Sequence, residues 1–201
     1  MNYSEKEVTI FKGVLALAHQ GRNVYNITAQ QIASAAGVGK GTIYDYFSSK
    51  EEIIAKAIIY SIENENSLLK EKVDALSSFK EKMYAVYERV LAGFTNSLSS
   101  FNLIISIGGT KELLSFLTSG YQSYEQLMEQ STEIFTQILT CGVLEGEILP
   151  PRDADYVRMI ISANYMAVGK AAMEAHTNGT MDTAKELIMA NAYKMLIKSL
   201  N

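Results

Sequence analysis

The sequence predicts an all-α chain, and three observations support that prediction. The 201 residues include only two prolines, Pro150 and Pro151, which stand side by side. Long stretches are rich in Ala, Leu, Glu, Lys and Met, whose side chains lose little rotamer entropy in a helix. Apolar residues recur at three- and four-residue steps, which is the period of one helix face. Helices should therefore form nearly all of the regular structure.

The first helix should begin after Ser4. Ser4 and Glu7 have the spacing of a capping box, in which each side chain accepts a hydrogen bond from the other residue's backbone N–H. Val8, Phe11 and Leu15 then follow at helical spacing, before Gly21 provides a stop.

Two short helices should follow, separated by a tight turn. Thr28 and Gln31 form a second capping box, and Gly37 can end that helix in the left-handed conformation. The next helix should open at Gly39 and run to Phe47, a residue that we expect to lie in the core.

A third capping box, Ser49 with Glu52, opens a long periodic segment that reaches about Leu69. Later helices are predicted at residues 79–98, 121–144, 153–175 and 180–200, with Asp153 as an N-cap after the prolines. Gly108 and Gly109 predict shorter, kinked helices within 101–118. The chain thus divides into a head, residues 1–48, and a body, residues 49–201, joined by the long helix without a flexible linker.

Composition narrows the location and the class of function. No apolar run reaches the roughly 18 residues that span a bilayer, and no leader pattern opens the chain, so we expect a cytoplasmic protein without membrane contact. The one cysteine, Cys141, is expected to be a buried reduced thiol rather than a redox sensor. With two histidines, a metal site is not expected. No phosphate loop, nucleophile elbow or paired-histidine motif is present, so we predict neither an enzyme nor a cofactor.

Charge favours the head as a nucleic-acid surface. The net charge is −4, but residues 1–50 hold five basic and three acidic side chains, so this segment carries +2 and the other 151 residues −6. Two short helices around a glycine turn can enter the major groove of DNA, the first aiming its amides at a phosphate and the second presenting early side chains to base edges. The residues expected to contact double-stranded DNA are Thr28, Ala29, Gln30, Gly39, Lys40, Gly41, Thr42, Tyr44, Asp45, Tyr46 and Lys50.

Lys40 should reach a guanine edge or a phosphate, and Lys50 a further phosphate. Tyr44 has two interpretations, a core ring or a ring whose hydroxyl reaches a phosphate. Gly39 and Gly41 keep bulk away from the duplex.

Residues 27–51 resemble the DNA-binding head of the TetR family of transcription regulators. Thr28, Ile32-Ala33, Ala36-Gly37-Val38, Gly41-Thr42, Tyr44, Phe47 and Ser49-Lys50-Glu51 stand where that family's pattern expects them. The resemblance implies about nine helices, a homodimer joined by the last two, and a body pocket whose ligand changes the spacing of the paired heads. Repression of a palindromic operator would be the usual outcome. Gly13, Ala18 and Tyr46 depart from the pattern, and the first two are expected to loosen the packing of the head.

The last two predicted helices carry small and apolar residues that suit a four-helix bundle across a twofold axis. The expected interface residues are Ala163, Ala167, Ala171, Leu187, Ala190, Tyr193, Leu196 and Ile197. A purely intrachain core is the alternative interpretation of the same pattern.

Aromatic and methionine residues gather in the body and suit an adaptable apolar pocket for a small-molecule effector of unknown identity. The predicted lining is Tyr87, Phe94, Phe101, Phe116, Tyr124, Met128, Tyr165 and Met166. The function predicted is a ligand-responsive, dimeric, DNA-binding regulator released by an apolar or aromatic molecule. The alternative is a DNA-bound helical scaffold that recruits a protein partner without a small ligand.

Overall fold

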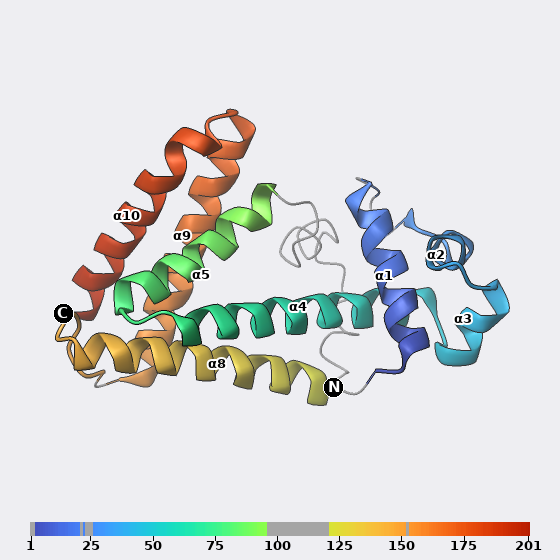
Figure 1. Cartoon of the computed structure of the whole chain (residues 1–201), viewed down its shortest axis with the longest axis horizontal. Helices are drawn as coiled ribbons and strands as arrows, with labels where there is room; N and C mark the ends of the chain where they lie inside the picture. The colour runs from blue at the N-terminus through green and yellow to red at the C-terminus, as the bar shows by residue number, and fades with distance from the viewer. Residues whose placement is uncertain (1–2, 21, 23–25, 96–120, 152) are drawn as a thin grey trace. The chain divides into compact units, whose positions relative to one another are not determined.

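A computed structural model describes residues 3–20, 22, 26–95, 121–151 and 153–201. In this part of the chain every regular element except a single 3₁₀ residue is an α-helix, as predicted (Figure 1). The helices are α1 Glu5–His19, α2 Ala29–Ala36, α3 Lys40–Tyr46, α4 Lys50–Ala75, α5 Phe79–Thr95, α8 Tyr121–Leu144, α9 Ala154–Thr177 and α10 Met181–Leu200. The helices predicted for residues 101–118 lie outside the described residues.

Two compact units divide the chain, and their boundary falls inside α4 and α8. The first, the head unit, comprises residues 1–65 and 97–130, and the second, the body unit, comprises 66–96 and 131–201. The head unit takes in the first half of α4 because Ile53, Ile54, Ala57 and Ile58 pack into its core.

The head core is made of apolar side chains from α1 to α4. Its largest fully buried members are Phe11, Phe47, Ile10, Ile27, Ile32, Ile43, Ile53 and Ile58. Gly13 brings α1 close to the end of α2, because a Cβ at Gly13 would lie 2.9 Å from the Cβ and backbone N of Ala36. The expectation that Gly13 loosens the head was therefore wrong, since the missing side chain permits a tight helix contact. Ala18 is also buried in this core.

Capping interactions fix the helix starts of the head. Both reciprocal bonds of the Ser4–Glu7 and Thr28–Gln31 capping boxes are present. The third box differs in one partner: the Ser49 hydroxyl accepts the Glu52 N–H at 3.1 Å, but the Glu52 carboxylate accepts from the backbone N–H and hydroxyl of Ser48.

The body unit joins segments that are far apart in sequence. The second halves of α4 and α8 run in the same direction (Figure 1). Two hydrogen bonds link them: Asn66 Nδ2 donates to Ser131 Oγ at 3.3 Å, and Gln137 Nε2 donates to Asp74 Oδ1 at 2.7 Å. Helix α5 packs on the α9–α10 hairpin. Asp153 caps α9, as predicted, by accepting the N–H groups of Asp155 and Tyr156.

Helix α4 continues past the predicted end at Leu69 to Ala75. Lys82 stabilises that last turn, since its buried ammonium donates to the Val73 carbonyl at 2.5 Å and cations are favoured at helix C-termini. Another capping box, Ser78 with Glu81, opens the next helix.

Candidate nucleic-acid interface and effector cavity

The turn between α2 and α3 has the geometry that the sequence predicts. Gly37 adopts φ 64°, a left-handed conformation that costs glycine nothing, and its N–H bonds back to the end of α2. The N–H of Val38 reaches the Ala33 carbonyl at 2.9 Å, which completes a 6→1 C-terminal cap. Only three residues, 37–39, therefore separate α2 from α3.

Helix α3 has one buried and one exposed face. Ile43 and the C-cap residue Phe47 are buried in the head core, so Phe47 is a core aromatic as expected. Tyr44 and Tyr46 are 52% and 43% exposed. The exposure of Tyr44 removes the interpretation as a core ring and leaves its hydroxyl accessible.

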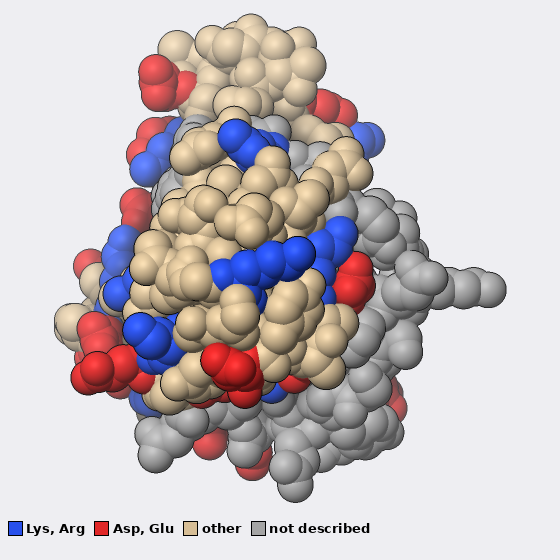
Figure 2. All heavy atoms as spheres, turned by 90° about the vertical axis from the view of Figure 1, so that its right-hand side faces the viewer, with Lys and Arg blue, Asp and Glu red and all other residues tan. Residues whose placement is uncertain are grey.

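The two lysines of the predicted interface differ. Lys40, the first residue of α3, is exposed and has no ion pair within the described residues. Lys50 is more sheltered, and its ammonium lies 3.6 Å from the Glu51 carboxylate. Figure 2 shows basic side chains crossing the face that carries α2 and α3.

Neither the backbone conformation nor the packing of the free protein requires a glycine at position 41. It is an exposed helical residue outside the left-handed region, and a Cβ there would meet nothing within 4 Å. At Gly39, the N-cap of α3, a Cβ would make only an ordinary contact with Thr42 Oγ1 at 3.6 Å. Both glycines leave the leading edge of α3 open to an approaching molecule.

The N-terminus of α2 offers backbone donors. Thr28 and Gln31 satisfy each other's N–H groups, whereas those of Ala29 and Gln30 have no partner in the described part of the chain. The Ala29 side chain is buried and the Gln30 side chain is exposed. Free N–H groups at a helix N-terminus favour anions such as phosphate.

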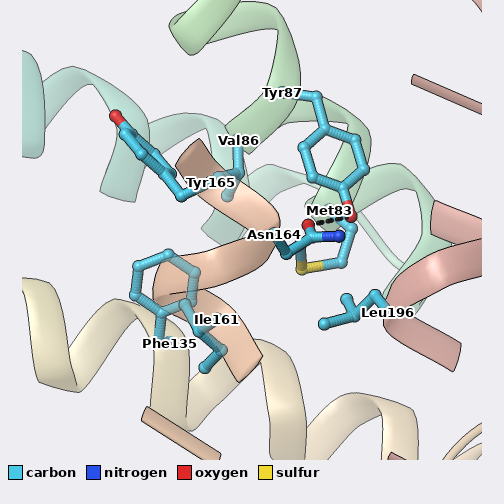
Figure 3. A pocket seen from close by; sticks show the side chains of 8 residues that line it. All are labelled: Met83, Val86, Tyr87, Phe135, Ile161, Asn164, Tyr165 and Leu196. Carbon is cyan, nitrogen blue, oxygen red and sulfur yellow. Dashed lines mark hydrogen bonds between the residues drawn. The ribbon is translucent and has the colours of Figure 1, made fainter. Parts of the chain in front are cut away.

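The body unit contains a small cavity of about 10 Å³, which is room for about one water molecule. Figure 3 shows its lining, contributed by α5, α8, α9 and α10: Met83, Val86, Tyr87, Phe135, Ile161, Asn164, Tyr165 and Leu196. The walls are mainly apolar, as in most ligand pockets.

One hydrogen-bonded pair lies in this wall. The Tyr87 hydroxyl donates to Asn164 Oδ1 at 2.9 Å, and Asn164 Nδ2 donates to the Ala192 carbonyl at 2.8 Å. Burial, together with the neighbouring Tyr193 and Tyr84, raises the pKa of Tyr87 well above its usual value despite the bond to Asn164. The phenol is therefore neutral at physiological pH.

The predicted pocket residues are distributed as follows. Tyr87 and Tyr165 line the cavity, whereas the Met166 side chain is 75% exposed and does not. Phe101 and Phe116, and the side chains of Phe94, Tyr124 and Met128, lie outside the described residues. Asn164 was missed because an isolated asparagine in a helical pattern gives no signal until its distant partner on α5 is known.

The predicted interface residues of α9 and α10 are mostly accessible. Ala163, Ala167, Leu187 and Ala190 are exposed, and Ala171, Tyr193 and Ile197 are half-buried. Leu196 is a correction: it is 1% exposed and lines the cavity, so it belongs to the intrachain core and offers no surface to a partner.

Cys141 is half-buried, and its thiol donates weakly toward Ser77 O and Glu145 Oε1. Burial raises the pKa of this thiol, and the Glu145 carboxylate raises it further. The reactive thiolate is disfavoured. No helix in the described part of the chain is long and apolar enough to cross a membrane.

The head segment resembles a known family of regulators. Residues 19–57 match the family model described as "Bacterial regulatory proteins, tetR family". This match supports the resemblance to the TetR family that the sequence motif predicts. The matched proteins are regulators rather than enzymes, in line with the sequence prediction.

Three of the matches extend beyond the head. The "Fatty acid metabolism regulator protein" of Bacillus subtilis is 28% identical over 134 residues, so the match spans 65% of this chain and 65% of the length of that curated relative. The structure of FadR from Bacillus subtilis in complex with stearoyl-CoA has a TM-score of 0.68 at 17% identity, covering 96% of this chain and 99% of that one. FadR from Bacillus halodurans gives 0.68 at 13%, covering 96% and 97%. At these identities the structural likeness establishes the fold.

Proposed function

We propose that this chain is a DNA-binding transcription regulator of the TetR type, a repressor that works in the cytoplasm as a homodimer on a palindromic operator and is released by an effector bound in the body. The observation that carries the proposal is the exposed leading edge of α3. There two glycines without a packing role, an unpaired lysine and two exposed tyrosines follow a tight turn in the segment matching the family model.

The division of work between the two helices follows from that geometry. Helix α2 meets the DNA backbone with the free amides of Ala29 and Gln30, while α3 enters the major groove. Lys40 and Thr42 reach base edges or phosphates, and the Tyr44 hydroxyl bonds a phosphate. Lys50 contributes less charge than Lys40, since Glu51 partly neutralises it.

Dimerisation through α9 and α10 is supported by exposed apolar side chains on one face of α9. Tyr156, Met159, Ala163, Met166 and Met173 are exposed at three-, four- and seven-residue steps, so they share one side of the helix. Leu187 and Ala190 continue such surface on α10. A twofold axis buries matching stripes from two copies.

One substitution that introduces a charge tests the proposed dimer interface. Met166→Glu should shift the mass in solution from two chains to one, because it places two carboxylates across the axis. Leu144→Glu, at an exposed leucine of α8, is the matched control and should remain dimeric. A wild-type monomer at micromolar concentration, or an unchanged Met166→Glu dimer, would contradict this interface.

The effector is proposed to be an acyl compound. The likeness to a fatty acid metabolism regulator and to a FadR bound to stearoyl-CoA supports this class, as does the apolar lining of the cavity. At about 10 Å³ the cavity is far smaller than the roughly 300–1,000 Å³ of most ligand pockets, so its walls must move apart to bind an effector. Phe135 and Tyr165, half-buried in its wall, would have to rotate to admit a long chain.

Selection of genomic fragments retained by the purified protein is the decisive test. We expect a palindromic site whose affinity falls steeply with salt, with Lys40→Ala flattening the log–log slope by about one and Lys170→Ala, on α9, leaving it unchanged. Stearoyl-CoA should weaken operator binding and raise thermal stability together, as reciprocal coupling requires. Salt-independent binding would contradict the DNA proposal, and operator binding unaffected by any acyl compound would favour a scaffold.

A further inference from the structure

Asn164 is an unusual residue for the middle of an apolar wall. It is 2% exposed on α9, and burying an amide costs free energy unless its hydrogen bonds are replaced. Tyr87 from α5 and the Ala192 carbonyl from α10 supply two partners, so the amide joins three helices at the cavity (Figure 3).

The amide retains one unused donor. A primary amide carries two N–H groups, and Asn164 Nδ2 uses one of them, toward Ala192. No second acceptor lies within bonding distance of Nδ2 among the described residues. The Tyr87 oxygen donates to Asn164 and keeps lone-pair capacity. Tyr165, the other lining residue with a hydroxyl, points that hydroxyl away from Asn164 (Figure 3).

Charge is missing from the lining. The remaining groups are the side chains of Met83, Val86, Phe135, Ile161 and Leu196, with no lysine, arginine, aspartate or glutamate among them. A carboxylate or ammonium placed there would lose its hydration without gaining a counter-ion, which is strongly unfavourable. A neutral oxygen would lose little, because one N–H can bond it.

We propose that this cavity, once Phe135 and Tyr165 rotate outward, takes an uncharged hydrocarbon group bearing one hydrogen-bond-accepting oxygen, a carbonyl or a hydroxyl, and that Asn164 Nδ2 donates to that oxygen. The proposal rests on the proposed function only in supposing that the body binds an effector, and it specifies which part of an effector the cavity accepts. An ionised head group of the same molecule must lie outside the lining residues.

Three eight-carbon probes test the proposal: 2-octanone, n-octane and octanoate. Their binding to the full-length protein, without DNA, is measured by calorimetry at neutral pH. The wild type should bind 2-octanone about tenfold more tightly than n-octane, the fold-change of one net hydrogen bond, and octanoate more weakly than either. Equal affinity for the ketone and the alkane, or octanoate as the tightest ligand, would overturn it. Binding of none of the three would show that the cavity holds an ordered water only.

Asn164→Leu, nearly the same size, should bring the ketone and alkane affinities within twofold of each other, while Tyr87→Phe keeps the preference for the ketone. If the leucine variant does not fold, the side-chain amide resonances of Asn164 in the wild type provide the same test. They should shift on adding 2-octanone and stay in place with n-octane, and the reverse would overturn the proposal. Operator binding is measured separately, so a failed DNA test leaves this result intact.

Discussion

The head and the body of the molecule are built from different interactions. The core cluster of the head consists of apolar side chains, and Ser61 is the one buried polar residue among those described in the head unit. The body unit buries Asn66, Lys82 and Asn164, each bonded to a residue on another helix or at the end of one. Under the proposed function, the apolar core and its local caps hold the head in one shape on DNA, whereas the shared polar groups of the body exchange partners when an effector enters.

The largest expected effect is in the head. Phe47→Ala should cost about 3–5 kcal/mol, because it removes a fully buried ring that touches Phe11 at 5.8 Å between centroids. Urea unfolding followed by circular dichroism measures the loss. Tyr46→Ala, the exposed neighbour, should change stability by less than about 1 kcal/mol. Equal losses for the two variants would contradict the assignment of faces on α3.

The stability of the body unit should depend on the hydroxyl of Tyr87. Tyr87→Phe keeps the ring but leaves Asn164 Oδ1 without its donor, which should cost about 1–3 kcal/mol. Tyr156→Phe is the matched control, since its hydroxyl donates at the surface to Ser199 O, and its loss should be smaller. Thermal unfolding compares the two, and an equal effect would argue against a structural role for the buried pair.

A smaller effect concerns pH. Burial alone would raise the pKa of Glu52, but hydrogen bonds from Lys56 and Ser48 outweigh it and hold the pKa below the usual 4.5. Its stabilisation is therefore present above about pH 4.5 and is lost as the pH falls through the lowered value. Glu52→Gln should cost about 0.5–1 kcal/mol at pH 7 and progressively less in acid. A difference between the two proteins that does not change with pH would contradict this account.

The two units differ in how much of their structure could be predicted from the sequence, and the reason is physical. The capping boxes at Ser4 and Thr28 and the turn at Gly37 are local, since each partner lies within a few residues. Their geometry can be inferred from spacing alone. The contact of Gly13 with Ala36, the bond of Tyr87 to Asn164 and the placement of Leu196 in the cavity each join distant helices. A single sequence does not show which helix faces which, so these features became visible only in the fold.

Glycines on α1 and α3 give the sharpest contrast, because the same substitution should have opposite effects on stability. Gly13→Ala forces a Cβ against Ala36 and should destabilise the protein by about 1–3 kcal/mol. Gly41→Ala meets open space and should stabilise it by about 0.5–1 kcal/mol through helix propensity.

The operator affinity of Gly41→Ala, measured by fluorescence anisotropy beside its free energy of unfolding, tests most directly whether α3 is the edge that meets DNA. We predict a protein more stable than the wild type that binds its operator at least tenfold more weakly, because the added methyl group meets the duplex rather than the protein. An affinity equal to that of the wild type would contradict the placement of α3 in the groove.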